Sequence, residues 1–186
     1  MKSNTQRSHL HLAPEPGPAR DDLGLQARSL PYSTLIRYKQ WGDRGLHQVV
    51  GNEISRLDPG DASIVMRILD HIHVVDRIFQ HHLQGLPSPF QAPRSERIPA
   101  LEELSAATEA ADDWYVAYVA GLSPREFDET MEFRYSNGSP ARMTRGEMIL
   151  HVCLHGTYHR GNAGILLQKT GIVPNDDRMT DFLEAA

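Results

Sequence analysis

The sequence predicts an all-α protein, a four-helix bundle with a small β-hairpin between its third and fourth helices. Two patterns support this prediction: apolar residues recur at helical spacing in four long segments, and breaks rich in proline and glycine separate these segments. A third pattern, a short stretch in which apolar and polar residues alternate, predicts the hairpin. No repeat or sharp boundary divides the 186 residues, so we expect one domain over residues 31–186 and a flexible tail over residues 1–30.

Local signals place the four helices along the chain. The expected helices cover residues 33–57, 61–83, 101–119 and 145–169. Pro59-Gly60 is predicted to end the first helix, and Asp61 or Ser63 to cap the second. Thr144, followed three residues later by Glu147, is typical of a capping box at the start of the fourth helix.

The hairpin is expected between the third and fourth helices. Met131, Phe133 and Tyr135 alternate with polar residues, and Asn137-Gly138 is a strong signal for a tight turn. A short helix over residues 177–183 is expected to close the chain.

Composition limits the compartment and the class of partner. The net charge is −5, and no run of lysine and arginine forms the basic patch that nucleic-acid binding usually requires. Cys153 is the single cysteine, which fits a reducing compartment. There is no apolar run long enough to span a membrane, and the N-terminal residues lack the apolar core of a signal peptide. We therefore expect a cytoplasmic protein that binds neither nucleic acid nor membrane.

Histidine spacing points to a metal site. His155 and His159 are i,i+4 neighbours on the predicted fourth helix, one turn apart on a single face. Both lie within roughly 40° of the centre of that helix's apolar stripe. The stripe consists of Met148, Val152, Ala163 and Leu166. Two buried imidazoles need partners for their nitrogen atoms, and one metal ion would satisfy both. The pair alone can also arise by chance in a hydrogen-bonded core.

The second helix offers a third ligand. Its predicted inward stripe consists of Ile64, Ile68, Ile72, Val75 and Phe79. His71 lies at the edge of this stripe, whereas His73 points roughly 140° away and is expected to face solvent, as is His81. His82 returns to the stripe about 16 Å further along the helix, so it could replace His71 only if the helices were offset. We therefore predict His71, His155 and His159 as the metal ligands.

Two further histidines could line the same site. His151 shares a face with His155 and could be a fourth ligand, a hydrogen-bond partner or a core residue; we favour a role other than ligation, since three histidines leave one position open. His47 on the first helix is a weaker candidate. Neutral imidazoles suit zinc, nickel, copper or iron, and an open position would allow the metal to activate water or a thiol.

At this point the sequence resembles the DinB-like proteins of the broader DinB/YfiT superfamily. The strongest match is HVCLHGTYHRGNAG at 151–164, similar to the family's H-x-x-x-H-R-G signature. Three other segments are similar in the same order: RYKQWGDRGL at 37–46, DHIHVVDRIFQHHLQG at 70–85 and QKTGIVPNDDRMTDFL at 168–183. Lys39, Gly42 and Asp43 stand where Asn, Ala and Asn are common in the family, and Asn162 stands where Gln is usual.

The resemblance implies a four-helix bundle, commonly dimeric, with one divalent metal held by His71, His155 and His159. It also implies a possible thiol S-transferase activity, in which the metal lowers the pKa of a low-molecular-weight thiol. We expect zinc or nickel as the metal. The working hypothesis is a metal-dependent enzyme of thiol S-transferase or hydrolase type, acting on an unidentified small molecule. The alternative is a stress-response protein that binds a metal or small molecule without turnover, and a bundle without metal ranks third.

Other features carry structural expectations. The back of the fourth helix presents Cys153, Gly156, Thr157, Gly164 and Leu167, and we predict that this face helps form a homodimer. Packing against the hairpin or the tail is the alternative for this face. Cys153 itself is expected to be a buried core thiol.

Three segments are open to more than one interpretation. Tyr38 and Trp41 fit core packing or pocket lining. Arg160 is expected to form an ion pair at the helix back, within the chain or across subunits, although binding of an anionic substrate is also open. The proline-rich connection over residues 85–99 could form a lid at one end of the bundle.

Overall fold

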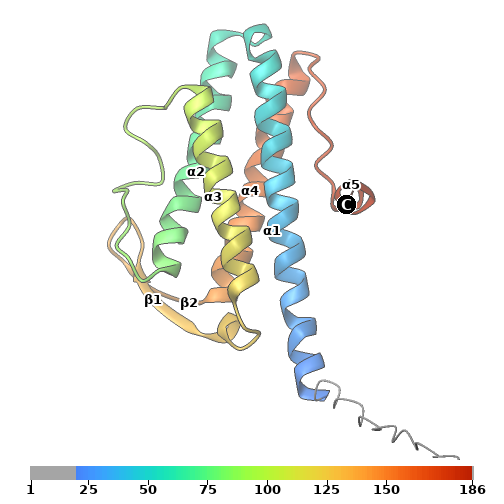
Figure 1. Ribbon diagram of the computed structural model, residues 1–186. Helices are drawn as coiled ribbons and strands as arrows, with labels where there is room; N and C mark the ends of the chain where they lie inside the picture. The colour runs from blue at the N-terminus through green and yellow to red at the C-terminus, as the bar shows by residue number, and fades with distance from the viewer. Residues whose placement is uncertain (1–19, 186) are drawn as a thin grey trace, which may run out of the picture.

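The computed structural model describes residues 20–185, with side chains from residue 30 onward. Four long helices, a two-stranded antiparallel hairpin and a short terminal helix make up the fold (Figure 1). The elements are α1 (Arg20–Glu53), α2 (Pro59–Leu83), α3 (Leu101–Gly121), β1 (Thr130–Arg134), β2 (Pro140–Thr144), α4 (Arg145–Lys169) and α5 (Met179–Ala185), with 3₁₀ turns at Ile54–Arg56 and Glu126–Asp128. The predicted four-helix bundle with a hairpin between α3 and α4 is confirmed.

The packing pairs of the bundle determine which residues meet. Helix α1 packs against α3 and α4, and α2 packs against the same two helices, so α1 and α2 lie diagonally across the bundle. The hairpin closes the end at which α4 begins and also contacts α2 (Figure 1). Among residues 20–185, none of the helices combines the length and apolar character required to cross a bilayer.

The first two helices differ from prediction at their starts. Helix α1 begins at Arg20 and runs through Pro31, so it includes part of the predicted tail. The tail expected over residues 1–19 lies outside the described part of the chain. Helix α2 is capped by Asp58, not by Asp61 or Ser63: its carboxylate accepts hydrogen bonds from the backbone N–H groups of Gly60 and Asp61. Pro59, predicted to end a helix, occupies the first turn of the next, where its missing N–H costs nothing.

The predicted signals around α4 are confirmed. Thr144 and Glu147 form a capping box, in which each side chain accepts a hydrogen bond from the other's backbone N–H. In the hairpin, Met131 pairs with Met143, and Gly138 adopts the positive φ that its tight turn requires. The start of α4 is therefore fixed directly beside the hairpin.

A polar layer divides the core in two. One apolar cluster lies toward the hairpin and includes Ile36 and Tyr115, and a second lies toward the α1–α2 connection and includes Val50 and Leu104. Between them lies Lys39, whose side chain is fully buried. Most of the buried charged side chains belong to this layer. Its members are Lys39, Asp43, Asp76, Asp112 and Arg160.

The predicted burial along α2 is wrong at one stripe residue, Ile64, and at His73 outside the stripe. Ile64 is half exposed, whereas His73, expected in solvent, is buried at 8% exposure. The middle of α2 packs against α3 on one side and α4 on the other, so it has no solvent face of the kind that a single stripe assumes. His73 lies near Thr108 of α3, and burial lowers the pKa of its imidazole to about 4. His81, also expected in solvent, is half buried and bonds to the carbonyl of Arg77.

The back face of α4 is buried within the same chain. Cys153, Gly156, Gly164 and Leu167 are all covered. Helix α1 and the segment around Pro174 lie against this face, and a Cβ added at Gly156 would lie 3.5 Å from Lys39 Cε. The proposal that this face forms a dimer interface is therefore wrong, because the small residues serve close packing inside the bundle. Cys153 is a core thiol, as predicted.

Candidate metal centre

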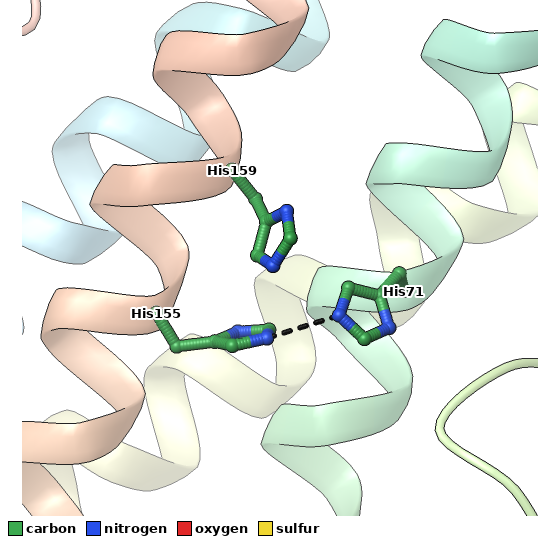
Figure 2. A group of neighbouring side chains, drawn as sticks. All are labelled: His71, His155 and His159. Carbon is green, nitrogen blue, oxygen red and sulfur yellow. Dashed lines mark hydrogen bonds between the residues drawn. The ribbon is translucent and has the colours of Figure 1, made fainter.

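Three histidines converge between α2 and α4. His155 and His159 project from α4 toward His71 on α2 (Figure 2). One ring nitrogen of each lies within 4.8 Å of one ring nitrogen of the other two, and the Nε2 atoms of His71 and His155 are 3.1 Å apart. The structure thus brings together the three residues that the sequence singled out.

A hydrogen bond outside the cluster sets the tautomer of His71. Its Nδ1 lies 2.6 Å from the carbonyl oxygen of Pro93. A carbonyl can only accept, so Nδ1 carries the proton and Nε2 presents a lone pair to the other two histidines. Metal-binding histidines usually have this arrangement, in which the distal nitrogen donates to a carbonyl or carboxylate.

The spacing and charge of the cluster fit a metal ion. Tetrahedral zinc with bonds of about 2.0–2.1 Å requires adjacent ligand nitrogens about 3.3 Å apart, close to the distance between His71 and His155. Burial, followed by the neighbouring imidazoles of His159 and His71, lowers the pKa of His155 to about 3. Burial and His71 also lower the pKa of His159. These imidazoles are neutral at physiological pH, which is the form that binds metals.

The cluster is partly open to solvent. His71, His155 and His159 are each half buried. Three protein ligands that remain partly open to solvent leave space for a further ligand, the arrangement typical of catalytic rather than structural zinc.

The proline-rich connection between α2 and α3 is fastened to α2 beside the cluster. Asp70 accepts a hydrogen bond from the backbone N–H of Ser95, and the next residue, His71, donates to Pro93. Asp70 is fully buried. Neither Asp70 nor Pro93 was among the site residues predicted from the sequence; the Asp-His pair at 70–71 was the available signal. The connection over residues 85–99, for which a lid was one interpretation, orients the candidate metal ligand His71 through Pro93.

The remaining candidate histidines lie outside the cluster. His151 packs its ring on Phe79 and does not join the three. His47 bonds to Ser105 and lines a separate cavity of about 80 Å³ between α1 and α3. His82 is buried near the hairpin, in ring contact with Phe133. None of these positions offers a nitrogen to the cluster.

A larger cavity adjoins the cluster on the hairpin side. Its volume is about 360 Å³, and His155 and Pro93 form part of its wall. The other main walls come from α2 and the hairpin, through Val75, Phe79, Phe133 and Met143. Such a volume falls in the range of small-molecule sites in proteins.

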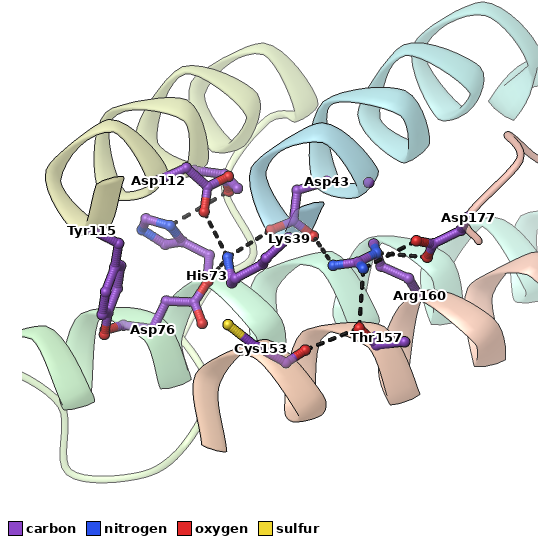
Figure 3. A network of polar contacts seen from close by, with 12 residues as sticks. Lys39, Asp43, His73, Asp76, Asp112, Tyr115, Cys153, Thr157, Arg160 and Asp177 are labelled. Atoms are coloured by element: carbon purple, nitrogen blue, oxygen red, sulfur yellow. Dashed lines mark hydrogen bonds and ion pairs between the residues drawn. The ribbon is translucent and has the colours of Figure 1, made fainter. Parts of the chain in front are cut away.

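A second polar cluster lies at the centre of the bundle (Figure 3). The ammonium of Lys39 contacts one carboxylate from each of three helices, at 2.6 Å to Asp43, 2.7 Å to Asp76 and 2.6 Å to Asp112. These aspartates also have the spacing of a metal site, but here Lys39 supplies the cation. Burial by itself would lower the pKa of Lys39. The attraction of the three carboxylates outweighs this effect of burial and holds the pKa of Lys39 well above its usual value.

Arg160 extends this network to the C-terminal segment. Its guanidinium binds Asp177 through two hydrogen bonds and Asp43 through a third. A Cβ added at Gly42 would lie 2.8 Å from that guanidinium. The expected ion pair of Arg160 is thus formed within the chain.

Tyr38 and Trp41 pack beside this network. Their rings stack on each other and both meet Phe182 of α5 at steep angles, so the core-packing interpretation holds for them. They hold the end of the chain against α1.

These features define a class: a helical-bundle protein with three histidines gathered between two helices beside a small-molecule cavity. The sequence matches the DinB family over residues 32–186, and the chain belongs to this family. No curated protein and no solved structure matches it.

Proposed function

We propose that this DinB-family protein binds one divalent metal ion, zinc or nickel, through His71, His155 and His159 and uses it in catalysis. The observation that carries the proposal is the tautomer of His71, since the Pro93 carbonyl turns the lone pair of Nε2 toward two other neutral imidazoles. Without a cation, His155 Nε2 would have to carry its proton and donate it to His71 Nε2, while the buried Nδ1 of His155 has no partner among the described residues. The half-open position of the cluster supports an enzyme over a structural site.

The reaction class that fits best is transfer to a thiol or hydrolysis. When bound, the metal would lower the pKa of a thiol or water molecule that it coordinates. The chain's own thiol is unsuited to this role, because burial raises the pKa of Cys153 to about 12. A thiol substrate would therefore be a low-molecular-weight compound from solution. The adjoining cavity would hold the second substrate and exclude water from it.

Metal analysis tests the binding step. Protein purified without a histidine tag is expected to hold about one equivalent of metal, and His71→Ala, His155→Ala and His159→Ala to lose most of it. His81→Ala is the matched control, since His81 lies on α2 but bonds only within its own helix. Equal metal content in all four variants would contradict the site.

A turnover assay separates catalysis from the alternative, a stress-response protein that binds metal or a small molecule without turnover. Thiols such as cysteine and glutathione are incubated with an electrophilic acceptor and metal-loaded protein. A rate above background that His155→Ala abolishes supports the enzyme. Binding of one equivalent of metal with no turnover across the thiols and electrophiles favours the alternative.

We also propose that the protein forms a homodimer, through the outer face of α4 and not its back. Leu154, Tyr158 and Ile165 lie at helical spacing on this face, and each is about two-thirds exposed. Tyr158→Glu is expected to shift the protein to a monomer in analytical ultracentrifugation. An unchanged mass would exclude this face.

A further inference from the structure

The cavity beside the histidine cluster follows one stripe of α2. Val75, Ile78, Phe79 and His82 occur at i, i+3, i+4 and i+7 and form one wall. His155 of α4 belongs to the opposite wall, and Phe133 of the hairpin closes the far end near His82. The cavity therefore has two different ends, one at the candidate metal ligand His155 and one at His82.

The walls indicate a neutral, largely apolar occupant. Among the described residues that line this cavity, none is aspartate, glutamate, lysine or arginine. The aromatic rings of Phe79 and Phe133 lie 6.0 Å apart at a steep angle. An ionic ligand would lose its hydration there without gaining an opposite charge, whereas a flat ring system would replace water with dispersion contacts.

His82 supplies a buried polar group at the far end, where the other polar lining residues, Tyr135 and Ser136 of the hairpin, are exposed. It is 6% exposed, and its Nε2 is buried without a hydrogen-bond partner in the described part of the chain. The rings of Phe133 and Phe79 flank its imidazole, at 4.5 and 6.0 Å between centroids. A buried polar atom of this kind normally has a hydrogen-bond partner. A ligand that reaches His82 Nε2 would supply that partner at a position where water does not compete for the hydrogen bond.

We propose that this cavity binds a neutral aromatic or alicyclic molecule that carries one hydroxyl or carbonyl group, bonded to His82 Nε2, with its opposite end beside His155. The identification of the His155 end as the reacting end rests on the proposed function. The binding mode itself depends only on the walls of the cavity and on His82. Substrates would accordingly be small uncharged ring compounds, and charged metabolites would be excluded.

The first test measures the hydrogen bond at His82. The probes are 1-naphthol and naphthalene, titrated into metal-free full-length protein at pH 7 and followed by naphthyl fluorescence. Naphthol is expected to bind about fivefold more tightly, the value of one neutral hydrogen bond. His82→Phe, which keeps a flat ring, is expected to abolish this preference while naphthalene still binds. Equal affinities in the wild type, or a preference that survives in His82→Phe, would overturn the proposal.

The second test measures the exclusion of charge. 1-Naphthalenesulfonate has the same ring system with an anionic group, and it is expected to bind at least tenfold more weakly than naphthol. Phe133→Ala is expected to weaken naphthol binding by a similar factor, because it opens the far wall. Ile64→Ala is the control, an apolar truncation at an exposed position of α2 outside the cavity. Sulfonate binding as tight as naphthol binding would contradict a neutral site.

A third measurement locates the ligand and separates its failure from that of the metal site. In protein loaded with paramagnetic Co²⁺, the naphthol protons away from the hydroxyl are expected to relax fastest. If Co²⁺ does not bind, the proposed metal centre fails, while the first two tests still decide on the cavity. If Co²⁺ and naphthol both bind without enhanced relaxation, the cavity proposal fails and the metal centre stands.

Discussion

The histidine cluster and the aspartate cluster meet the same limit on donor spacing but differ in how their charge is balanced. In each, three side chains of metal-binding type bring one donor atom within 4.8 Å of the others. The aspartates are fully buried, and Lys39 places an ammonium among them. The histidines are half buried, the pKa values of His155 and His159 are lowered, and no ion pair of the described residues places a cation among them. Spacing alone therefore does not identify a metal site; the presence or absence of an internal cation separates the two.

The largest effect is expected from removing that internal cation. Lys39→Met keeps most of the side-chain volume but leaves the buried carboxylates of Asp43 and Asp112 without the Lys39 cation, which should lower the free energy of unfolding by about 3–5 kcal/mol. Denaturant titration measures this change. Arg44→Ala, which breaks an ion pair exposed on both sides, should change stability by less than about 1 kcal/mol.

A double variant tests the cause of the Lys39 effect. If Lys39→Met is too unstable to study, Lys39→Met with Asp112→Asn should recover part of the loss, because one carboxylate is also removed. A double variant less stable than Lys39→Met would show that packing, not charge, dominates at this position.

The next effect is stabilisation by metal at the histidine cluster. At a free metal concentration 100 times the Kd, zinc or nickel should stabilise the protein by about 2.7 kcal/mol, raising Tm by about 5–10 °C. Thermal unfolding with and without metal measures the shift. His155→Ala should abolish it, whereas Asp43→Asn should unfold at lower temperature yet keep the shift. A shift lost in Asp43→Asn but kept in His155→Ala would reverse the assignment of the two clusters.

A smaller effect is expected from the clamp beside His71. Asp70→Ala removes the acceptor for Ser95 N–H and loosens the segment that holds Pro93 against His71, so metal affinity should fall about tenfold, or about 1.4 kcal/mol. Competition with a metallochromic chelator measures the Kd. Asp70→Asn retains an acceptor and should restore most of the affinity.

A loop variant serves as the control for the clamp. Ser88→Ala removes hydrogen bonds that stay within the connection, and it should leave the metal affinity unchanged. Equal loss of affinity in Ser88→Ala and Asp70→Ala would mean that the whole connection, not the Asp70 contact, orients His71.

The smallest effect is a pH dependence confined to the aspartate cluster. Burial raises the pKa of Asp76 to about 8. The folded protein therefore holds a proton that the unfolded chain releases near pH 4, so this contribution to stability is complete below pH 4 and is lost as pH rises through about 8. Wild type should lose about 1 kcal/mol relative to Asp76→Asn between pH 6.5 and 7.5. Denaturant titrations at the two pH values measure the free energy of unfolding of both proteins. The same change with pH in wild type and in Asp76→Asn would contradict a protonated Asp76.

The structure explains why the first-helix motif departs from the family pattern at Lys39, Gly42 and Asp43. Lys39 and Asp43 form an ion pair one turn apart, and Asp43 also binds Arg160. Gly42 lies where the guanidinium of Arg160 leaves no space for a Cβ. Three separate differences in one motif are thus parts of a single buried network.

Local physics explains what could be predicted. Helix periodicity, the capping box at Thr144 and the Asn137-Gly138 turn depend on residues close in sequence, and all three agree with the structure. His73 and Ile64 were misplaced because the burial of a helix depends on how many neighbours it has, which its own sequence does not encode.

The sequence by itself determined the fold class, the family resemblance and the three histidines to consider, because helical spacing places i,i+4 side chains together whatever surrounds them. Only the tertiary structure showed that Pro93 sets the tautomer of His71 and that Asp70 fastens the connection. It also showed that Lys39 occupies the rival cluster. These contacts join segments distant along the chain, so they depend on how the helices and the connection pack.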